Sequence, residues 1–172
     1  MKMMDQIKNK YSDEKNAFTQ QRQKLWGENA ERNLKLSSYY HKRLQAVYKL
    51  VIPESSSVLE IGCGKGDLLA SVNPKTGVGV DYSEEMIEAA RPKHSNLEFL
   101  VSDGLEMSIE VQKFDYIILS DLINDVWDVQ SLLKQLKPFC TKETRLIFNF
   151  YSHLWQIPLK FAQRLGFASP NM

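Results

Sequence analysis

The sequence predicts an α/β fold with a doubly wound, mainly parallel sheet of about five strands and helices on both of its faces. Three observations support this prediction. After residue 53, short apolar segments of strand length alternate with segments of helical periodicity. The strand segments are apolar at consecutive positions, as expected where helices cover both faces of a sheet. Gly62, Gly64 and Gly66 lie between the first strand and the next helix, where such sheets bind ligands.

The length and composition of the chain indicate a single globular domain. It has 172 residues, of which 43% are hydrophobic and 25% charged, as in globular proteins and unlike disordered or fibrous ones. Cys63 and Cys140 are single and far apart, which excludes a zinc knuckle or a disulfide framework. No apolar stretch is suited to a membrane span or a signal peptide, so we expect a cytoplasmic protein.

The net charge of +1 hides a basic first 50 residues and an acidic remainder. The basic side chains are spread out, so we interpret them as a solvated helical face and expect no nucleic-acid partner. We expect residues 1–36 to form a polar helical extension and residues 37–172 to form the domain. The domain opens with a helix over 38–51 that Pro53 stops. Its apolar face consists of Leu44, Val47, Tyr48 and Val51.

The remaining elements follow in a regular order. Strands are predicted over 58–61, 77–80, 97–101, 114–119 and 145–150. Helices are predicted over 67–72, 83–91 and 158–165, with a further helix between the last two strands. Ser83 is the expected N-cap of the second of these helices and Pro92 its expected stop. Asp125 is the expected N-cap of the helix whose apolar face is Val129, Leu132, Leu133 and Leu136.

The three glycines indicate a nucleotide-like cofactor, because backbone without Cβ atoms can turn tightly and approach a ligand closely. About 20 residues on, Asp81 ends the second strand, where a carboxylate can bind both hydroxyls of a ribose. A dinucleotide such as NAD is disfavoured. The third glycine of its G-x-G-x-x-G fingerprint would fall at Asp67, whose charge would oppose a pyrophosphate.

The spacing Glu60-x-Gly62-x-Gly64-x-Gly66 resembles the first motif of class I S-adenosylmethionine-dependent methyltransferases, which have a Rossmann-like fold. Further segments agree in order over about residues 39–150. Asp81 matches the family's ribose-binding acid, and Asp103 in VSDG matches its adenine contact. The segment FDYIILSD, residues 114–121, matches the fourth-strand motif that faces the methionine part and the methyl acceptor.

This resemblance implies a site for S-adenosyl-L-methionine and its product S-adenosyl-L-homocysteine, and no metal. The implied cofactor-binding residues are Tyr39, Glu60, Gly62, Cys63, Gly64, Gly66, Asp81, Tyr82, Met86, Asp103, Gly104 and Ser120. Leu105 is expected to pack on the adenine, and Tyr40 to help close the pocket. The thiol of Cys63 is expected to be packing material, because no base stands beside it. Tyr82 and Met86 suit the core as well as they suit an adenine contact, and Asp81 could instead only cap the next helix.

No catalytic residue is identified, because a general base is needed only if the acceptor must lose a proton. The candidates are His41, on the helix before the sheet, and Asp121, after the fourth strand. His153 and Asp125 are further candidates, whereas His94 lies in a polar loop and is not a candidate. For each histidine, a role as a surface or structural residue is the favoured interpretation.

One departure from the family concerns the end of the chain. Class I methyltransferases carry a C-terminal antiparallel hairpin beside the fifth strand, and no such pattern follows Phe150 here. The aromatic strand 148–151 would then be an open edge, and such edges tend to be paired or covered. Either the chain is part of a longer polypeptide, or a homodimer covers the edge. Residues 38–53 and 120–136 also resemble bifunctional proteins in which this domain precedes a family 2 glycosyltransferase.

Two functions of different classes remain. The first is an S-adenosylmethionine-dependent methyltransferase acting on a small-molecule or glycan/lipid-related acceptor. The second is a non-catalytic module of a larger protein that binds the cofactor or a partner. Nothing in the sequence distinguishes oxygen, nitrogen and carbon as the methylated atom.

Overall fold

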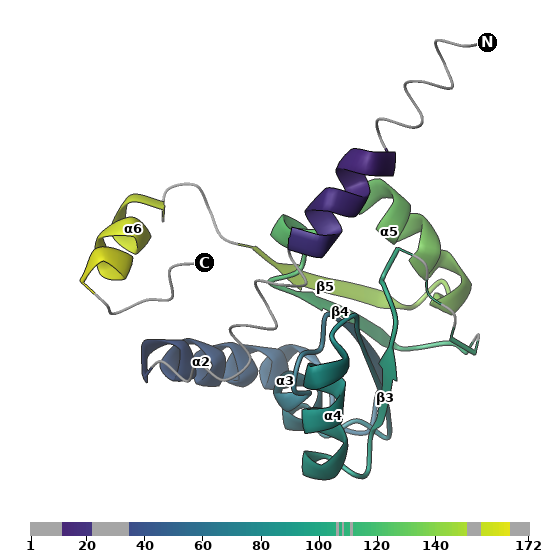
Figure 1. Ribbon diagram of the computed structural model, residues 1–172. Coiled ribbons are helices and arrows are strands. Elements are labelled where there is room, and N and C mark those ends of the chain that lie inside the picture. Colours follow the sequence, from purple (N-terminus) through teal and green to yellow (C-terminus); the bar gives the residue numbers. More distant parts are fainter. Residues whose placement is uncertain are drawn as a thin grey trace, which may run out of the picture.

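The computed structural model describes residues 12–21, 35–105, 107, 109–110, 112–150 and 156–165. Within these ranges, five strands form one sheet in the order β3-β2-β1-β4-β5, and every neighbouring pair is parallel (Figure 1). The strand order reverses between β1 and β4, which creates the crevice where doubly wound sheets bind ligands. The prediction of a five-stranded parallel sheet is confirmed.

The elements have the following bounds. The strands are β1 Ser57–Ile61, β2 Thr76–Asp81, β3 Glu98–Val101, β4 Tyr116–Ser120 and β5 Arg145–Asn149. The α-helices are α2 Lys35–Val51, α3 Asp67–Ser71, α4 Glu84–Lys93, α5 Val129–Leu136 and α6 Gln156–Arg164, and a further helix covers residues 12–21. Short 3₁₀ turns, η1 Ile123–Asp125 and η2 Lys137–Phe139, flank α5.

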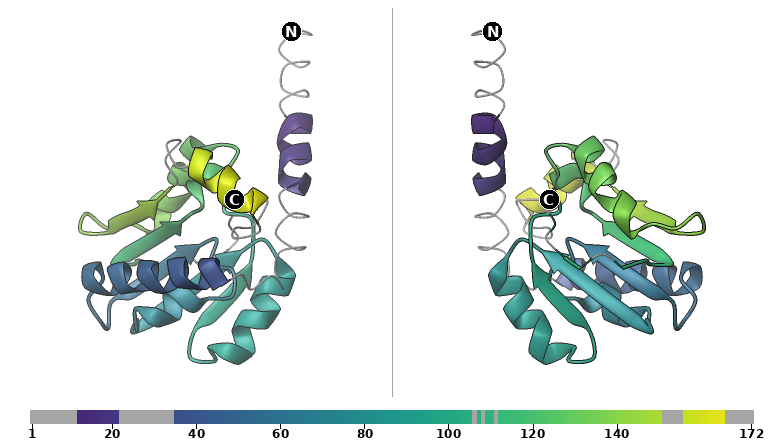
Figure 2. Two further views of the ribbon diagram at one scale, coloured as in Figure 1. Left: turned by 90° about the vertical axis from the view of Figure 1, so that its left-hand side faces the viewer. Right: turned by 90° about the vertical axis from the view of Figure 1, so that its right-hand side faces the viewer.

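Helices cover both faces of the sheet, as the alternating pattern predicted (Figure 2). On one face, the strand residues Val58 and Ile118 join a buried cluster that includes Tyr48 of α2, Leu69 of α3 and Ile87 of α4. On the other face, strand residues pack against α5. That second cluster includes Leu59, Ile61, Val78, Val80, Ile117, Leu119, Leu132 and Leu136. The sheet therefore has two apolar faces, which holds the carboxyl ends of its strands in a fixed arrangement.

Two helix boundaries differ from the predictions. Pro92 does not stop α4, which continues through it to Lys93. The fixed φ of proline is helical, so Pro92 removes one donor near the helix end without breaking the last turn. Asp125 does not cap α5. The N-cap is Asp128, whose carboxylate accepts hydrogen bonds from the Ser131 amide at 2.9 Å and hydroxyl at 2.7 Å.

Other boundaries are close to expectation. Ser83 is the N-cap of α4, and its hydroxyl accepts a hydrogen bond from the Met86 amide at 3.3 Å. Helix α6 begins two residues before Pro158. Proline is tolerated in this first turn because its missing N–H group would have no hydrogen-bond partner within the helix. Of the predicted extension over 1–36, residues 12–21 are helical and Lys35 already belongs to α2. Residues 1–11 and 22–34 lie outside the described residues.

Strand β5 ends the sheet, and among the described residues only β4 pairs with it. Phe148 and Phe150 stack with ring centroids 6.3 Å apart, and they are 51% and 59% exposed. The predicted aromatic edge is thus open in the described part of the chain. In the same ranges, no helix is long and apolar enough to cross a lipid bilayer.

Candidate functional site

The glycine loop, residues 62–66, joins β1 to α3 through backbone angles that favour glycine. Gly62, Gly64 and Gly66 have φ values of +74°, +51° and +74°. A Cβ atom on Gly66 would lie 2.4 Å from the ring of Phe99, whereas a Cβ on Gly64 would meet no atom within 4 Å. Packing therefore requires glycine at 66, while Gly64 keeps one side of the loop clear for a ligand.

Asp81 ties this loop to the end of β2. Its Oδ2 accepts a 2.8 Å hydrogen bond from the Gly64 amide, and its Oδ1 accepts a 2.9 Å bond from the Ser83 amide. The residue is only 9% exposed, and burial raises the pKa of its carboxyl group, although these amides oppose the shift. The cap of α4 is the hydroxyl of Ser83, so capping does not account for Asp81.

Glu60 lies under the glycine loop and is 2% exposed. One carboxyl oxygen receives a backbone hydrogen bond from Leu69 in α3, and Oε2 has no hydrogen-bond partner among the described residues. Burial raises the pKa of Glu60 well above its ordinary value, and the nearby Asp81 adds to this rise. An unpaired buried carboxyl oxygen is costly, so this position suits a donor or a cation brought by a ligand.

A second polar group gathers where β4 and β5 end. The Tyr40 hydroxyl lies 2.9 and 3.1 Å from the two oxygens of Asp121, and the Asn149 amide donates to one of these oxygens. The Tyr48 hydroxyl donates to Asn149 at 2.8 Å. Asp121 has a φ of +54°, in the left-handed region that is uncommon for residues other than glycine. Four side chains from α2, β5 and the end of β4 thus form one network.

Burial dominates the electrostatics of this network. It raises the pKa of Asp121, while the hydrogen bond from Tyr40 opposes the rise. It also raises the pKa of Tyr48 to about 12. Tyr48 therefore stays neutral at physiological pH and can donate to Asn149.

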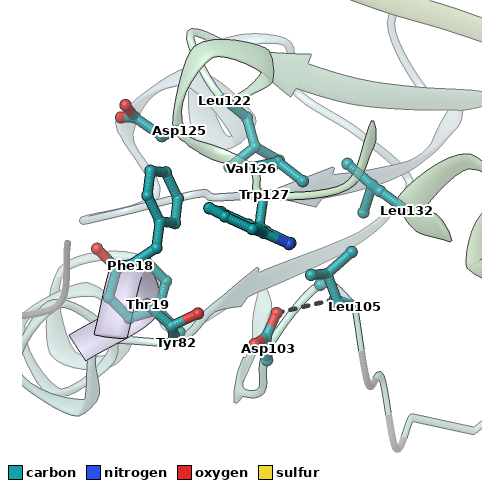
Figure 3. A pocket seen from close by; sticks show the side chains of 11 residues that line it. Phe18, Thr19, Tyr82, Asp103, Leu105, Leu122, Asp125, Val126, Trp127 and Leu132 are labelled. Atoms are coloured by element: carbon teal, nitrogen blue, oxygen red, sulfur yellow. Dashed lines mark hydrogen bonds between the residues drawn. The ribbon is translucent and has the colours of Figure 1, made fainter. Parts of the chain in front are cut away.

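A pocket adjoins the ends of β2 and β3 (Figure 3). It brings together Tyr82, Asp103 and Leu105, which are expected to contact the adenine, and Gly104, another residue predicted to bind the cofactor. The carboxylate of Asp103 accepts a 2.9 Å hydrogen bond from the Leu105 amide, which holds this turn in place. The other lining residues are Phe18, Thr19, Leu122, Asp125, Val126, Trp127 and Leu132.

The remaining sequence candidates lie around these features. Tyr39 is 65% exposed on α2, beside the bonded Tyr40, and Met86 is half-buried on α4. The Cys63 thiol is buried near Gly79, and burial raises its pKa, in keeping with a packed thiol. Ser120 bonds with the Tyr48 side chain.

The three histidines lie in different parts of the chain. His41 is exposed on α2, with its ring centroid 5.5 Å from that of Tyr40. His94, which the sequence reading set aside, has a structural partner: its ring nitrogen lies 2.9 Å from the Asp67 carboxylate at the start of α3. His153 lies outside the described residues. Within those residues, no cluster of three or more His, Cys, Asp and Glu side chains could hold a metal ion.

Sequence reasoning missed Tyr48, Asn149, Phe18 and Trp127. For Asn149 a signal existed, because it ends β5 directly beside Ser120 of β4 in the parallel register. Polar residues at the carboxyl ends of adjacent parallel strands share one edge of a sheet. For Phe18 and Trp127 no comparable local pattern exists.

Comparison with known proteins agrees with this geometry. Residues 52–165 match the family described as a methyltransferase domain. A probable S-adenosylmethionine-dependent methyltransferase of Mycobacterium tuberculosis is 28% identical over 116 residues, which cover 64% of this chain and 42% of that protein. A ubiquinone biosynthesis O-methyltransferase of Coxiella burnetii is 28% identical over 127 residues, covering 67% of this chain and 54% of that protein.

The fold has relatives among solved structures. The plantazolicin methyltransferase BpumL, in complex with a triazolic desmethylPZN analog and S-adenosylhomocysteine, aligns with a TM-score of 0.53 and 25% identity. The alignment covers 66% of this chain and 51% of that one. The strand order, the glycine loop and the bonded Asp81 together define a class I S-adenosylmethionine-dependent methyltransferase domain. The chain belongs to the methyltransferase-domain family. It spans about half the length of the curated relatives cited above.

Proposed function

We propose that this chain transfers a methyl group from S-adenosylmethionine to a small-molecule acceptor. The observation that carries the proposal is the hydrogen bond from the Gly64 amide to Asp81, which joins the glycine loop to the end of β2. It supports the proposal because it holds the carboxylate that is expected to bind the ribose beside a backbone segment that has free space around Gly64.

The residues present fit this cofactor. Its methionine part carries an ammonium group, and Glu60 offers a buried carboxyl oxygen without a partner in the described structure. The backbone of residues 62–66 would hold the rest of that part, and Asp81 the ribose. Tyr82, Met86, Asp103, Gly104 and Leu105 would hold the adenine. When bound, S-adenosylmethionine supplies a methyl group that its sulfonium activates, so the chain has mainly to orient the acceptor and exclude water.

The network around Asp121 supplies the acceptor side of the proposed reaction. Asp121 would accept a proton from a hydroxyl or amine acceptor, since its carboxylate stands at the carboxyl end of β4 beside the crevice. Tyr40 and Asn149 would keep this carboxylate oriented. His41, one residue along α2 from Tyr40, is the second candidate for this role.

The proposed class of methyl acceptor is supported by the names of similar proteins and by a resemblance in the sequence. The names of the relatives include an O-methyltransferase of ubiquinone biosynthesis and a methyltransferase of plantazolicin. Both support a small organic acceptor, and the resemblance to bifunctional glycosyltransferases supports a glycan- or lipid-related one.

The alternative function is a non-catalytic module of a larger protein. It is favoured by the exposed side chains of Phe148 on β5 and of Phe150 just after it, at an edge that a second subunit or a fused glycosyltransferase domain could cover. Under this alternative the cofactor can bind, but no acceptor is methylated.

Calorimetric titration with S-adenosylmethionine and S-adenosylhomocysteine, with NAD as a control ligand, tests the proposal. We expect both sulfur compounds to bind, Asp81→Ala to weaken them, and the exposed Glu88→Ala to leave them unchanged. Release of S-adenosylhomocysteine with quinol, phenol, amine and glycan acceptors then distinguishes catalysis from the alternative. Absence of binding to the folded wild-type chain would rule out the proposed function.

A further inference from the structure

The helix over residues 12–21 carries an aromatic side chain into the pocket that adjoins the ends of β2 and β3. Within this helix the half-buried residues are Lys15, Phe18 and Thr19, which share one helical face, and Phe18 is the only aromatic among them. The Phe18 ring lies 5.4 Å from the Trp127 ring, centroid to centroid, at an interplanar angle of 54°. Phe18 therefore anchors this helix where it meets the pocket.

Both walls of the pocket are held by short-range hydrogen bonds. Trp127 directly precedes Asp128, whose side chain fixes the start of α5 through Ser131. On the opposite wall, Asp103 fixes the turn that presents Leu105. Figure 3 shows the ring of Phe18 pointing from its helix toward the indole of Trp127, with Asp103 and Leu105 on the other side of the indole.

We propose that Phe18 and Trp127 form an aromatic wall of the adenine end of the cofactor site, so that the helix over residues 12–21 is a working part of that site. This inference rests on the function proposed above and adds positioning residues that the glycine motif does not include. A purine has apolar faces and a polar edge. Phe18, Trp127 and Leu105 provide apolar surface, and Asp103 provides a polar group, around one pocket.

The geometry of the pair also decides where the purine lies. A ring inserted between two aromatic rings needs a separation of about 7 Å, twice the contact distance of about 3.5 Å. The rings of Phe18 and Trp127 are already in tilted contact at 5.4 Å. The adenine therefore lies against the pair and not between its two members.

The test measures binding of two probes to the full chain. S-adenosylhomocysteine is the complete cofactor product, with adenine, ribose and amino acid. 5′-Methylthioadenosine has the adenine and ribose but lacks the amino acid. We expect Phe18→Ala to weaken both probes about tenfold, since stacking on an aromatic ring is worth this much or more. Phe18→Tyr keeps the aromatic face and should stay within about twofold of wild type. Phe161→Ala, at a 68% exposed position on α6, is the matched control.

A merely structural role for Phe18 predicts a different pattern. In that case Phe18→Ala lowers the melting temperature but binds 5′-methylthioadenosine as wild type does, which would overturn the inference. A loss for S-adenosylhomocysteine alone would also overturn it, because the effect would then lie at the methionine end.

Hydrogen exchange on the wild-type chain provides a second test that needs no variant. We expect the amides of residues 12–21 to gain protection when S-adenosylhomocysteine binds, and unchanged exchange there would contradict the inference. If the wild-type chain binds neither probe, the proposed function fails and this inference with it. Normal wild-type binding with an unaffected Phe18→Ala variant overturns the inference alone.

Discussion

The hydroxyl of Tyr40 lies within hydrogen-bond distance of both carboxyl oxygens of Asp121, although 81 positions separate the two residues. This contact fastens α2 to the end of β4, and Asn149 completes it from β5. A carboxylate held by two donors is oriented toward a fixed direction in the crevice. The contact thus joins the helix that precedes the sheet to the strand end that faces the proposed acceptor.

Replacing Tyr40 by phenylalanine should raise the pKa of Asp121 further. Burial already raises this pKa, and the hydrogen bond from Tyr40 favours the ionised form, so its loss leaves burial less opposed. A ¹³C NMR titration of the Asp121 carboxyl group measures the effect. Tyr39→Phe, at an exposed neighbouring position, should cause no change. An unchanged pKa in Tyr40→Phe would mean that this hydroxyl does not stabilise the carboxylate.

Substituting Asp81 by asparagine should weaken S-adenosylhomocysteine binding about 10- to 100-fold. The variant keeps the shape of the side chain but loses the charge that strengthens hydrogen bonds to ribose hydroxyls. Calorimetry with Glu88→Gln as control checks this expectation. Equal affinities for wild type and Asp81→Asn would remove Asp81 from the ribose site.

Glu60 should make the stability of the ligand-free chain fall as the pH rises. Its folded pKa is raised by burial, so its contribution is complete below the unfolded pKa of about 4.3 and is lost as the pH rises toward the folded pKa. Glu60→Gln cannot ionise. The free energy of unfolding of this variant should therefore increase relative to that of wild type as the pH rises above the unfolded pKa of about 4.3.

Urea unfolding at several pH values measures this difference, and the exposed Glu98→Gln provides a control. A difference between Glu60→Gln and wild type that stays constant with pH would show that Glu60 does not titrate as burial implies. Adding S-adenosylmethionine should reverse the order at high pH, since a bound ammonium group stabilises the ionised wild-type carboxylate.

Two alanine substitutions in the glycine loop should separate folding from binding. Gly66→Ala places a Cβ 2.4 Å from Phe99 at a φ of +74°, so it should destabilise the fold by more than the backbone cost of about 1–2 kcal/mol. Gly64→Ala meets open space and should carry only that backbone cost. Its methyl group would nevertheless stand on the ligand side of the loop.

Thermal unfolding and titration with S-adenosylhomocysteine, performed on both variants, check these expectations. Gly64→Ala should remain folded but bind the ligand more weakly, whereas Gly66→Ala should lower the melting temperature more. If Gly64→Ala binds with wild-type affinity, the clear side of the loop is not the ligand side.

Much of the fold could be predicted because its signals are local. The five strands are runs of apolar residues, and each was located within two residues of its observed bounds. Gly62, Gly64, Gly66 and Asp81 follow a spacing that a strand–loop–helix–strand unit imposes on a nucleotide-like site. Errors occurred where two local signals compete. Asp125 and Asp128 both precede α5, and the periodicity does not tell which of them caps the helix.

Contacts between distant segments depended on the tertiary structure. Tyr40 and Asp121 meet because α2, which packs on one face of the sheet, brings Tyr40 to the carboxyl end of β4. Phe18 meets Trp127 because the helix over residues 12–21 lies against the turn before α5. Such contacts come from the placement of whole helices, which depends on packing summed over many side chains and not on any short motif. The sequence by itself therefore identified the glycine loop and Asp81 as the predicted cofactor site. Which side chains surround that site depended on the packing of the helices in the tertiary structure.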